Sequence, residues 1–170
     1  MTTRHTFARI DLGTMLLVAK GSRLSGAYFE GHVHPPQADL IGEPVAEHDD
    51  QVLVQAAREL REYLVGERQQ FDIAVHTAGD PFSEQVWSQL RRIPFGTTTT
   101  YGAIATGLGN PGLAQRVGQA VGRNPIMIVV PCHRVLGADG SLTGYAGGLE
   151  RKRKLLALEE PPPAHAGRLF

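Results

Sequence analysis

Cys132 and His133 are the neighbouring side chains with the clearest chemical potential in this sequence. Cys132 is the only cysteine, and it follows Pro131 at the end of an apolar run, residues 126–130. Pro131 fixes its own φ and favours an extended residue before it, so we expect a strand here that ends at a defined point and aims the thiol. Positive charge from His133 and Arg134 lowers the pKa of a nearby thiol, which predicts a nucleophilic thiolate. The alternative is a small buried hydrophobic residue.

The composition limits the chemistry further. One cysteine among 170 residues excludes an internal disulfide and a cysteine-rich zinc site, and leaves no second thiol to regenerate a modified Cys132. His32, His34 and His48 lie close together, but without cysteines or spaced carboxylates they predict surface histidines and no metal site. We expect no cofactor. The absence of a signal peptide and of a long apolar run, with the free cysteine, predicts a cytoplasmic protein that binds no membrane.

Charge is divided unevenly along the chain, although the formal net charge is zero. Residues 1–85 contain 7 basic and 13 acidic side chains, a net charge of −6, whereas residues 86–170 contain 10 and 4, a net charge of +6. The half that contains Cys132 is therefore basic. Such asymmetry indicates a polyanionic partner or, with equal weight, a solvated basic surface.

The N-terminal part of the chain predicts an α/β domain with a small antiparallel sheet and a helix. Three β-rich runs separated by turn residues predict the sheet, at 6–10, 14–19 and 24–29. A stretch rich in Gly, Pro and His, 30–48, predicts a loop. Apolar residues at helical spacing over 50–65 predict an amphipathic helix, and 71–75 predicts a further strand. We bound this domain at residues 1–76, expect no chemistry in it, and assign 77–80 as a linker.

Residues 81–160 predict a second, mostly helical domain, and 161–170 a loose tail. Asp80 as N-cap and Pro81 at the first helical position predict the first helix of this domain. The last helix is expected over 149–159, where a proline run follows.

Two short helices in the basic half, 101–106 and 111–121, are joined by a glycine-containing turn, which is typical of a helix-turn-helix. Asp139-Gly140 then predicts a hairpin, and hence a wing. Basic residues in the first half of the last helix oppose its dipole by about 0.3–1 kcal/mol each, so phosphate contact by Arg151 and Lys152 is one explanation and a tolerated charge run is the other. One face of the second short helix carries small and amide residues suited to close approach to a nucleic-acid groove: Ala114, Gln115, Gly118 and Gln119.

The cysteine motif resembles a known family. Pro131-Cys132-His133-Arg134-Val135, preceded by Gly122-Arg123-Asn124-Pro125 and followed by Gly144-Tyr145-Ala146-Gly147-Gly148, resembles the O6-alkylguanine-DNA alkyltransferases, also called methylated-DNA cysteine methyltransferases. The resemblance runs from about residue 80 to 159 and is weaker before it. It implies a ribonuclease-H-like N-terminal α/β domain and a winged helix-turn-helix-like C-terminal domain. It also implies DNA repair by direct damage reversal.

In this family an alkyl group moves irreversibly from O6 of guanine in double-stranded DNA to the protein's own cysteine; O4-alkylthymine is left open as a second substrate. An alkyl group on a base oxygen is shielded inside a duplex, so the base has to be flipped out, at a cost of a few kcal/mol. A thioether is a poor leaving group, which makes one turnover the natural outcome. The implied partner is duplex DNA, bound through the minor groove with little sequence preference. We expect a monomer, with cooperativity on DNA left open.

The resemblance assigns a role to each matching residue. Cys132 accepts the alkyl group, His133 acts as its base through a water, and Glu159 orients the imidazole. Asn124 braces the turn that carries the cysteine, and Tyr101 turns the nucleotide out and protonates the departing guanine. The implied substrate-binding residues are Tyr145, Val135, Ala146 and Gly147. The expected DNA contacts are Ala114, Gln115, Arg116, Gly118, Gln119, Arg134, Arg151 and Lys152.

The chain departs from the family pattern at the helix expected to meet DNA. Where the family inserts an arginine into the space left by the flipped base, this chain has Gln115, followed by Arg116. One residue along a helix is about a 100° rotation, so either Gln115 fills the space or the helix shifts to present Arg116. Ala146 stands where some relatives have serine.

Three other functions compete with alkyl transfer. A cysteine hydrolase usually places its Cys and His far apart in sequence, unlike Cys132-His133. The related alkyltransferase-like proteins bind damaged DNA without repairing it, and their cysteine is replaced, so the presence of Cys132 favours transfer. A winged-helix DNA binder with a structural cysteine leaves the rest of the motif without a role.

Overall fold

The computed structural model describes residues 2–161. Three strands, β1 (Thr3–Ile10), β2 (Gly13–Lys20) and β3 (Arg23–Phe29), form the predicted antiparallel meander. The predicted loop at 30–48 holds two short 3-10 turns, η1 (Ala38–Leu40) and η2 (Glu47–Asp49), and a two-residue strand, β4 (Glu43–Pro44). Because β4 pairs in parallel with β1, the sheet is mixed, with strand order β3-β2-β1-β4.

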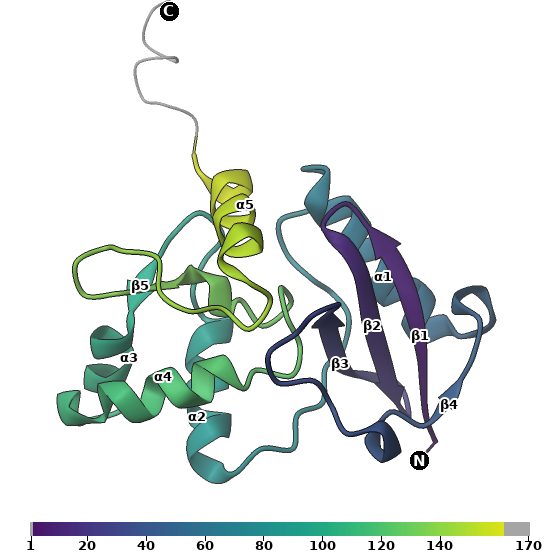
Figure 1. Cartoon of the computed structure of the whole chain (residues 1–170), viewed down its shortest axis with the longest axis horizontal. Helices are drawn as coiled ribbons and strands as arrows, with labels where there is room; N and C mark the ends of the chain where they lie inside the picture. Colours follow the sequence, from purple (N-terminus) through teal and green to yellow (C-terminus); the bar gives the residue numbers. More distant parts are fainter. Residues whose placement is uncertain (1, 162–170) are drawn as a thin grey trace, which may run out of the picture.

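Helix α1 (Gln51–Leu64) packs on this sheet, as its apolar spacing predicts (Figure 1). Asp50 caps it by accepting hydrogen bonds from Val52 N and Leu53 N, at 3.0 and 3.1 Å. Gly66, with φ +82°, follows its last turn in the left-handed conformation that glycine adopts at little cost. The buried face of the helix consists of Leu53, Ala56, Ala57, Glu59, Leu60 and Tyr63.

The predicted strand at 71–75 is wrong. Val75 alone makes an isolated bridge, to Leu24 of β3. Glu59, buried in α1, accepts hydrogen bonds from the backbone N–H groups of Asp72 and Ile73 at 2.9 and 3.1 Å. The Glu59 carboxylate thus binds the backbone N–H groups that would otherwise pair with a neighbouring strand. The segment therefore does not need a strand partner to satisfy them.

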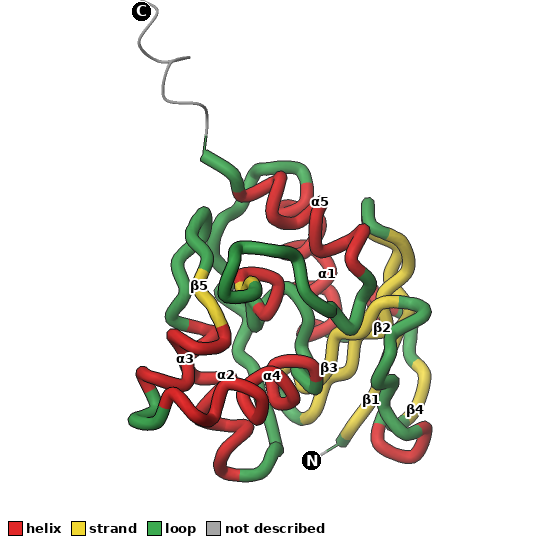
Figure 2. Tube along the Cα trace, turned by 60° about the vertical axis from the view of Figure 1, so that its left-hand side comes forward, coloured by secondary structure: helices red, strands yellow, loops and turns green. Residues whose placement is uncertain are grey.

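The C-terminal helices lie together on the opposite side of the molecule from the sheet, and both views show this separation (Figures 1 and 2). They are α2 (Pro81–Arg91), α3 (Tyr101–Gly107), the 3-10 turn η3 (Pro111–Leu113) and α4 (Ala114–Gly122). Asp80 caps α2 through Ser83 N at 2.8 Å, as predicted. The last helix, α5 (Leu149–Glu159), has the predicted bounds. The tail at 161–170 lies outside the described residues except for Pro161.

The predicted wing is not a β-hairpin. Asp139-Gly140 does form a turn, closed by Gly137 N donating to Ser141 O at 2.9 Å. However, β6 (Val135–Leu136) pairs in parallel with β5 (Thr99–Thr100), and residues 141–145 form no strand. The segment before the turn therefore pairs with the chain that leads into α3. No helix within residues 2–161 is long and apolar enough to cross a membrane.

Acidification from pH 7 to pH 5 is expected to destabilise the fold through His32. His32 is only 8% exposed, so the prediction of a surface histidine is wrong for this residue. Neither of its ring nitrogens has a hydrogen-bond partner within residues 2–161. Burial, then the charges of His34 and Arg151, lower its pKa to about 4. The unfolded chain, with a pKa near 6.5, therefore binds the proton first, and stability is lost as the pH falls from about 6.5 towards 4. Linkage gives a loss of about 2 kcal/mol between pH 7 and 5.

Denaturant titrations at both pH values test this expectation. His32→Phe keeps the edge-on contact with the Tyr28 ring, whose centroid lies 5.2 Å away, and removes the titrating group. The loss of stability at pH 5 should be smaller in this variant than in wild type. His48→Gln, at an exposed position, is the control and should behave as wild type. Equal losses in His32→Phe and wild type would contradict the assignment.

Candidate active site

The apolar run that precedes the cysteine forms a tight turn, so the predicted strand at 126–130 is wrong. Its residues make only isolated bridges, and Ile128 has φ +72°, in a region that β-branched residues rarely adopt. Asn124 closes the turn from inside: its side chain accepts from Ile126 N at 2.9 Å and donates to Val130 O at 2.8 Å. Both backbone groups are therefore used within the turn, which Asn124 holds together.

The N-terminal sheet holds this turn at its free edge. Ala27 of β3 donates to Pro125 O at 2.8 Å and accepts from Met127 N at 2.9 Å. Two backbone hydrogen bonds to a strand fix the position of the segment along the sheet. The N-terminal sheet, in which the sequence indicated no chemistry, thus contributes to placing the cysteine.

Cys132 begins a 3-10 turn, η4 (Cys132–Arg134), directly after this segment. The residue is 3% exposed, and its Sγ lies 3.9 Å from Met127 Sδ. Burial raises the pKa of the thiol to about 11, although a hydrogen bond with Asn124 and the charge of Lys152 act in the opposite direction. The expected lowering of the thiol pKa is therefore wrong for the resting protein. At neutral pH the thiol is protonated and needs a base.

His133, the residue after Cys132, is the candidate base, and it is fully buried. Its Nε2 lies 2.8 Å from Glu159 Oε2, at the C-terminal end of α5. Because an ionised carboxylate only accepts, we assign the proton of the neutral ring to Nε2 and a lone pair to Nδ1. Within residues 2–161, Nδ1 has no hydrogen-bond partner. Burial lowers the pKa of His133 despite the opposing effect of Glu159, so the ring is neutral and Nδ1 can accept a proton.

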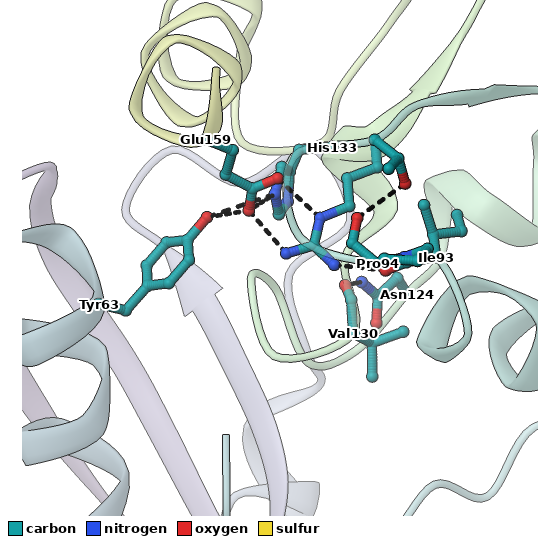
Figure 3. A network of polar contacts seen from close by, with 9 residues as sticks. Tyr63, Ile93, Pro94, Asn124, Val130, His133 and Glu159 are labelled. Carbon is teal, nitrogen blue, oxygen red and sulfur yellow. Dashed lines mark hydrogen bonds and ion pairs between the residues drawn. The ribbon is translucent and has the colours of Figure 1, made fainter. Parts of the chain in front are cut away.

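Glu159 is the centre of a buried polar network (Figure 3). Arg134 donates to it in a bidentate manner, from Nε to Oε1 and from Nη2 to Oε2, both at 2.7 Å. The hydroxyl of Tyr63 donates to Oε2 as well. Burial raises the pKa of Glu159, but hydrogen bonds from His133 and Arg134 outweigh it and lower the pKa to about 2. The carboxylate therefore stays ionised beside the imidazole.

Tyr63 is the functional-site residue that the sequence analysis missed. It belongs to the predicted helix at 50–65, where helical spacing marks only an apolar face. Its partner Glu159 lies 96 residues away along the chain. No local pattern links the two positions, and only the folded chain brings this residue of α1 next to the end of α5.

Arg134 and Lys152, both predicted to contact DNA, lie inside the protein. Arg134 is 6% exposed and, besides binding Glu159, donates from Nη1 to Ile93 O at 2.6 Å. Lys152 is fully buried, and its Nζ donates to Val135 O at 2.7 Å and to Thr143 O at 3.1 Å. These positions are at odds with the predicted DNA contacts, because both charges are used to hold the loops around the cysteine.

Arg151 is half-buried and joins α5 to residues of the N-terminal sheet and the turns beside it. Its guanidinium lies 4.6 Å from the centroid of the Phe29 ring and donates to three carbonyl oxygens at 3.0–3.1 Å, those of Leu12, Glu30 and Gly147. The guanidinium of Arg151 is therefore occupied by partners within the protein, which is at odds with the predicted DNA contact. Of the four basic residues in the first half of α5, Arg151 and Lys152 thus bind carbonyl oxygens, whereas Arg153 and Lys154 lie 3.4 and 3.8 Å from the Glu150 carboxylate.

The predicted substrate-binding residues lie in the loop before α5 and next to η4. Tyr145 is 8% exposed, and its hydroxyl has no partner within residues 2–161. Ala146 O accepts from Val33 N at 3.0 Å. A Cβ at Gly147 would lie 2.6 Å from the ring of Phe29, so this close packing requires glycine. The fourth residue, Val135, is less available than expected because its carbonyl binds Lys152 and its N–H donates to Cys132 O.

Tyr101, the predicted nucleotide-flipping residue, lies beside α4, the helix predicted to contact DNA. Tyr101 opens α3, and its hydroxyl lies 2.8 Å from Thr143 Oγ1. In α4, Gln115, Arg116 and Gln119 are exposed, whereas Ala114 and Gly118 are half-buried. The guanidinium of Arg116 lies 4.0 Å from the centroid of the Phe82 ring in α2. Arg116 is therefore engaged by a cation–π contact, worth about 0.5–1 kcal/mol at an exposed site.

Comparisons with known proteins agree with this geometry. A family model described as "6-O-methylguanine DNA methyltransferase, DNA binding domain" matches residues 81–161. The inducible methylated-DNA–protein-cysteine methyltransferase of Bacillus subtilis is 42% identical over 147 residues, covering 82% of each chain. The crystal structure of Mycobacterium tuberculosis OGT in complex with DNA superposes with a TM-score of 0.82 at 39% identity, covering 92% of each chain.

Another relative matches over a shorter region. The methylated-DNA–protein-cysteine methyltransferase of Mycolicibacterium paratuberculosis is 55% identical over 104 residues, which cover 61% of this chain and 63% of that protein. Fold and relatives together place the chain among the methyltransferases, and its candidate site contains a buried free thiol. Within that class, the chain belongs to the methylated-DNA–protein-cysteine methyltransferase family.

Proposed function

We propose that this protein repairs DNA by transferring an alkyl group from O6 of guanine in double-stranded DNA to Sγ of Cys132, once per molecule. One observation carries the proposal. The only cysteine is buried directly before a neutral imidazole whose Nε2 is held by an ionised carboxylate and whose Nδ1 is left as a proton acceptor. The names of the relatives, and the DNA bound to a homologous structure, support the same reaction.

In the proposed reaction the thiol proton passes through a water to Nδ1 of His133, and Sγ attacks the alkyl carbon. The S–C bond forms as the C–O6 bond breaks, and the electron pair moves to the guanine, which takes a proton from the Tyr101 hydroxyl. Ionised Glu159 stabilises the imidazolium that forms. No group in this scheme removes the alkyl from the thioether, so each molecule reacts once.

The burial of Cys132 supports a flipped base, because a base that remains stacked in a duplex cannot reach an acceptor that is 3% exposed. We place the DNA against α3 and α4, with minor-groove contacts made largely to the backbone. A Cβ at Gly118 would meet the Tyr101 ring at an ordinary 3.7 Å, so packing does not require glycine there and close approach of DNA explains it better. From the resemblance of the cysteine motif, we assign the N-terminal part to the ribonuclease-H-like kind and the C-terminal part to the helix-turn-helix-like kind, without the predicted β-hairpin wing.

Gln115→Ala is expected to slow repair of duplex DNA by about tenfold and to leave repair of single-stranded DNA within about twofold. We assign Gln115 to fill the space left by the flipped base, because it is exposed near the start of α4 while Arg116 lies against Phe82. Unstacking the base costs a few kcal/mol, and a side chain that fills the vacated space offsets part of this cost. Without that side chain the flipped state is less stable. Arg116→Ala is the matched control. Single-turnover rates that fall for Arg116→Ala and not for Gln115→Ala would reverse the assignment.

Peptide mapping tests the proposed function directly. The protein is incubated with a duplex that contains O6-methylguanine labelled on the methyl group, and both products are examined. The proposal predicts label on the peptide that contains Cys132 and unmodified guanine in the DNA. Label on another residue, or label released into solution as in a hydrolase, would contradict it.

A further inference from the structure

We propose that Tyr63, a residue of the N-terminal domain, is a positioning residue that sets the proton affinity of His133 by donating a hydrogen bond to Glu159. This inference rests on the proposed alkyl transfer, in which His133 is the base. It assigns the N-terminal domain a direct part in the chemistry of the C-terminal cysteine.

The geometry places Tyr63 at the carboxylate that holds the Nε2 side of His133. It is 1% exposed, and its hydroxyl donates to Oε2 of Glu159, the same oxygen that lies 2.8 Å from His133 Nε2. The hydroxyl is also 3.5 Å from His133 Nε2. Figure 3 shows the ring reaching across from α1 to the end of α5. Two aromatic rings hold it there, those of Phe71 and Phe95, with centroids 5.3 and 6.2 Å away.

The contact is not required by the packing of the ring. Phenylalanine would keep the aromatic contacts and the burial, whereas a buried phenol hydroxyl is costly unless it finds an acceptor. The acceptor it meets is a carboxylate that Arg134 already binds with two hydrogen bonds. The extra donor therefore adds little to the anchoring of Glu159, and its main effect falls on the charge of Oε2.

A donor on Oε2 weakens that oxygen as an acceptor for His133. The groups that face the imidazole are Glu159, Tyr63, Arg134 and Lys152. Of these groups, Glu159 alone stabilises the imidazolium. A hydrogen-bond donor to the Glu159 carboxylate weakens that stabilisation and so lowers the proton affinity of His133. Burial and the neighbouring carboxylate raise the pKa of Tyr63, which keeps its hydroxyl protonated as a donor. His133 is thereby kept neutral at the pH where it must accept the thiol proton.

The test is the pH dependence of single-turnover transfer from an O6-methylguanine duplex, for wild type, Tyr63→Phe and Tyr28→Phe. Removal of the donor should raise the acid midpoint of Tyr63→Phe by about 0.5–1 pH unit, which corresponds to the net strength of an ordinary hydrogen bond. The plateau rate at high pH should stay within about threefold of wild type. Tyr28→Phe, a tyrosine of β3 outside the network, should superpose on wild type. A Tyr63→Phe profile with an unmoved midpoint would overturn the proposal, even if the rate falls by one factor at every pH.

A second variant tests the sign and covers the case in which Tyr63→Phe does not fold. With 3-fluorotyrosine at position 63, a more acidic phenol of nearly the same shape, the midpoint should move below that of wild type. The pKa of His133, followed by NMR of ¹⁵N-labelled histidine without DNA, should shift in the same two directions. An unmoved His133 pKa in the fluorinated protein would refute the positioning role. Wild type that transfers no methyl group would instead refute the proposed function, and the NMR titration would still decide on Tyr63.

Discussion

Cys132→Ala is expected to abolish alkyl transfer while affinity for duplex DNA stays within about twofold of wild type. The reason is chemical, because the acceptor atom is removed and the described part of the chain offers no other thiol. DNA affinity should persist because the helices we place against DNA, α3 and α4, are distinct from the turn that carries Cys132. Single-turnover assays and fluorescence anisotropy with the same O6-methylguanine duplex measure the two quantities.

Met127→Leu is the matched control for this substitution. It removes the sulfur that lies 3.9 Å from Sγ, keeps the thiol, and conserves apolar volume, so it should retain transfer. Transfer that survives in Cys132→Ala would move the acceptor to another residue. Loss of DNA affinity in the same variant would indicate that the thiol holds the DNA-binding surface together.

Glu159→Ala is expected to lower the free energy of unfolding by about 3–5 kcal/mol and to reduce transfer at least a hundredfold. The substitution leaves the guanidinium of Arg134, the hydroxyl of Tyr63 and the Nε2–H of His133 buried without their shared acceptor. Removing one partner of a buried ion pair carries a cost of this size. Without the carboxylate the imidazolium is no longer stabilised, which slows proton removal from Cys132.

Glu160→Ala is the control for Glu159→Ala. The Glu160 side chain is exposed, so this substitution should change the free energy of unfolding by less than about 0.5 kcal/mol.

The pH dependence of stability supplies a further check. The folded-state pKa of Glu159, about 2, lies below that of an unfolded glutamate, so its contribution is complete above pH 4.5 and is lost as the pH falls towards 2. Chemical denaturation of both variants at pH 7 and pH 3 should show a smaller difference at pH 3. An undiminished difference would contradict the ionised state of Glu159.

Local signals in the sequence predicted the helices well. Asp80 caps α2 as predicted, the amphipathic helix expected over 50–65 is α1, and α5 has the predicted bounds. The meander of β1, β2 and β3 follows from alternating β-rich runs between short turns. These features depend on neighbours in the chain, so a single sequence contains the information that specifies them.

The three wrong predictions of secondary structure, two strands and a wing, have one physical cause. In each case the backbone groups bind partners that hydropathy and turn signals do not indicate. Glu59 binds the N–H groups of Asp72 and Ile73, and Asn124 binds both ends of the turn before Cys132, so two apolar runs that suggest strands are not strands. The prediction of a wing was wrong because β6 pairs with β5 and not with the segment that follows the Asp139-Gly140 turn. Hydropathy reports burial, and it does not report which partner satisfies the backbone.

The candidate site was predictable to the extent that its residues lie in one motif. The resemblance identified His133 and Glu159, and the structure brings their side chains together. It did not indicate that Lys152 would be buried against carbonyl oxygens, since charge alone suggested a surface contact with phosphate. The protonated state of the resting Cys132 thiol was also hidden, because burial in the folded chain outweighs the nearby positive charge.

The central claim is that Cys132 accepts one alkyl group and keeps it. The most direct measurement is the intact mass of the wild-type protein after incubation with a several-fold molar excess of O6-methylguanine duplex. We predict that the mass rises by one methyl group per chain, that unmodified protein disappears, and that repaired DNA accumulates only to one equivalent. An unchanged mass, a second methyl group, or repair that continues beyond one equivalent would contradict the claim.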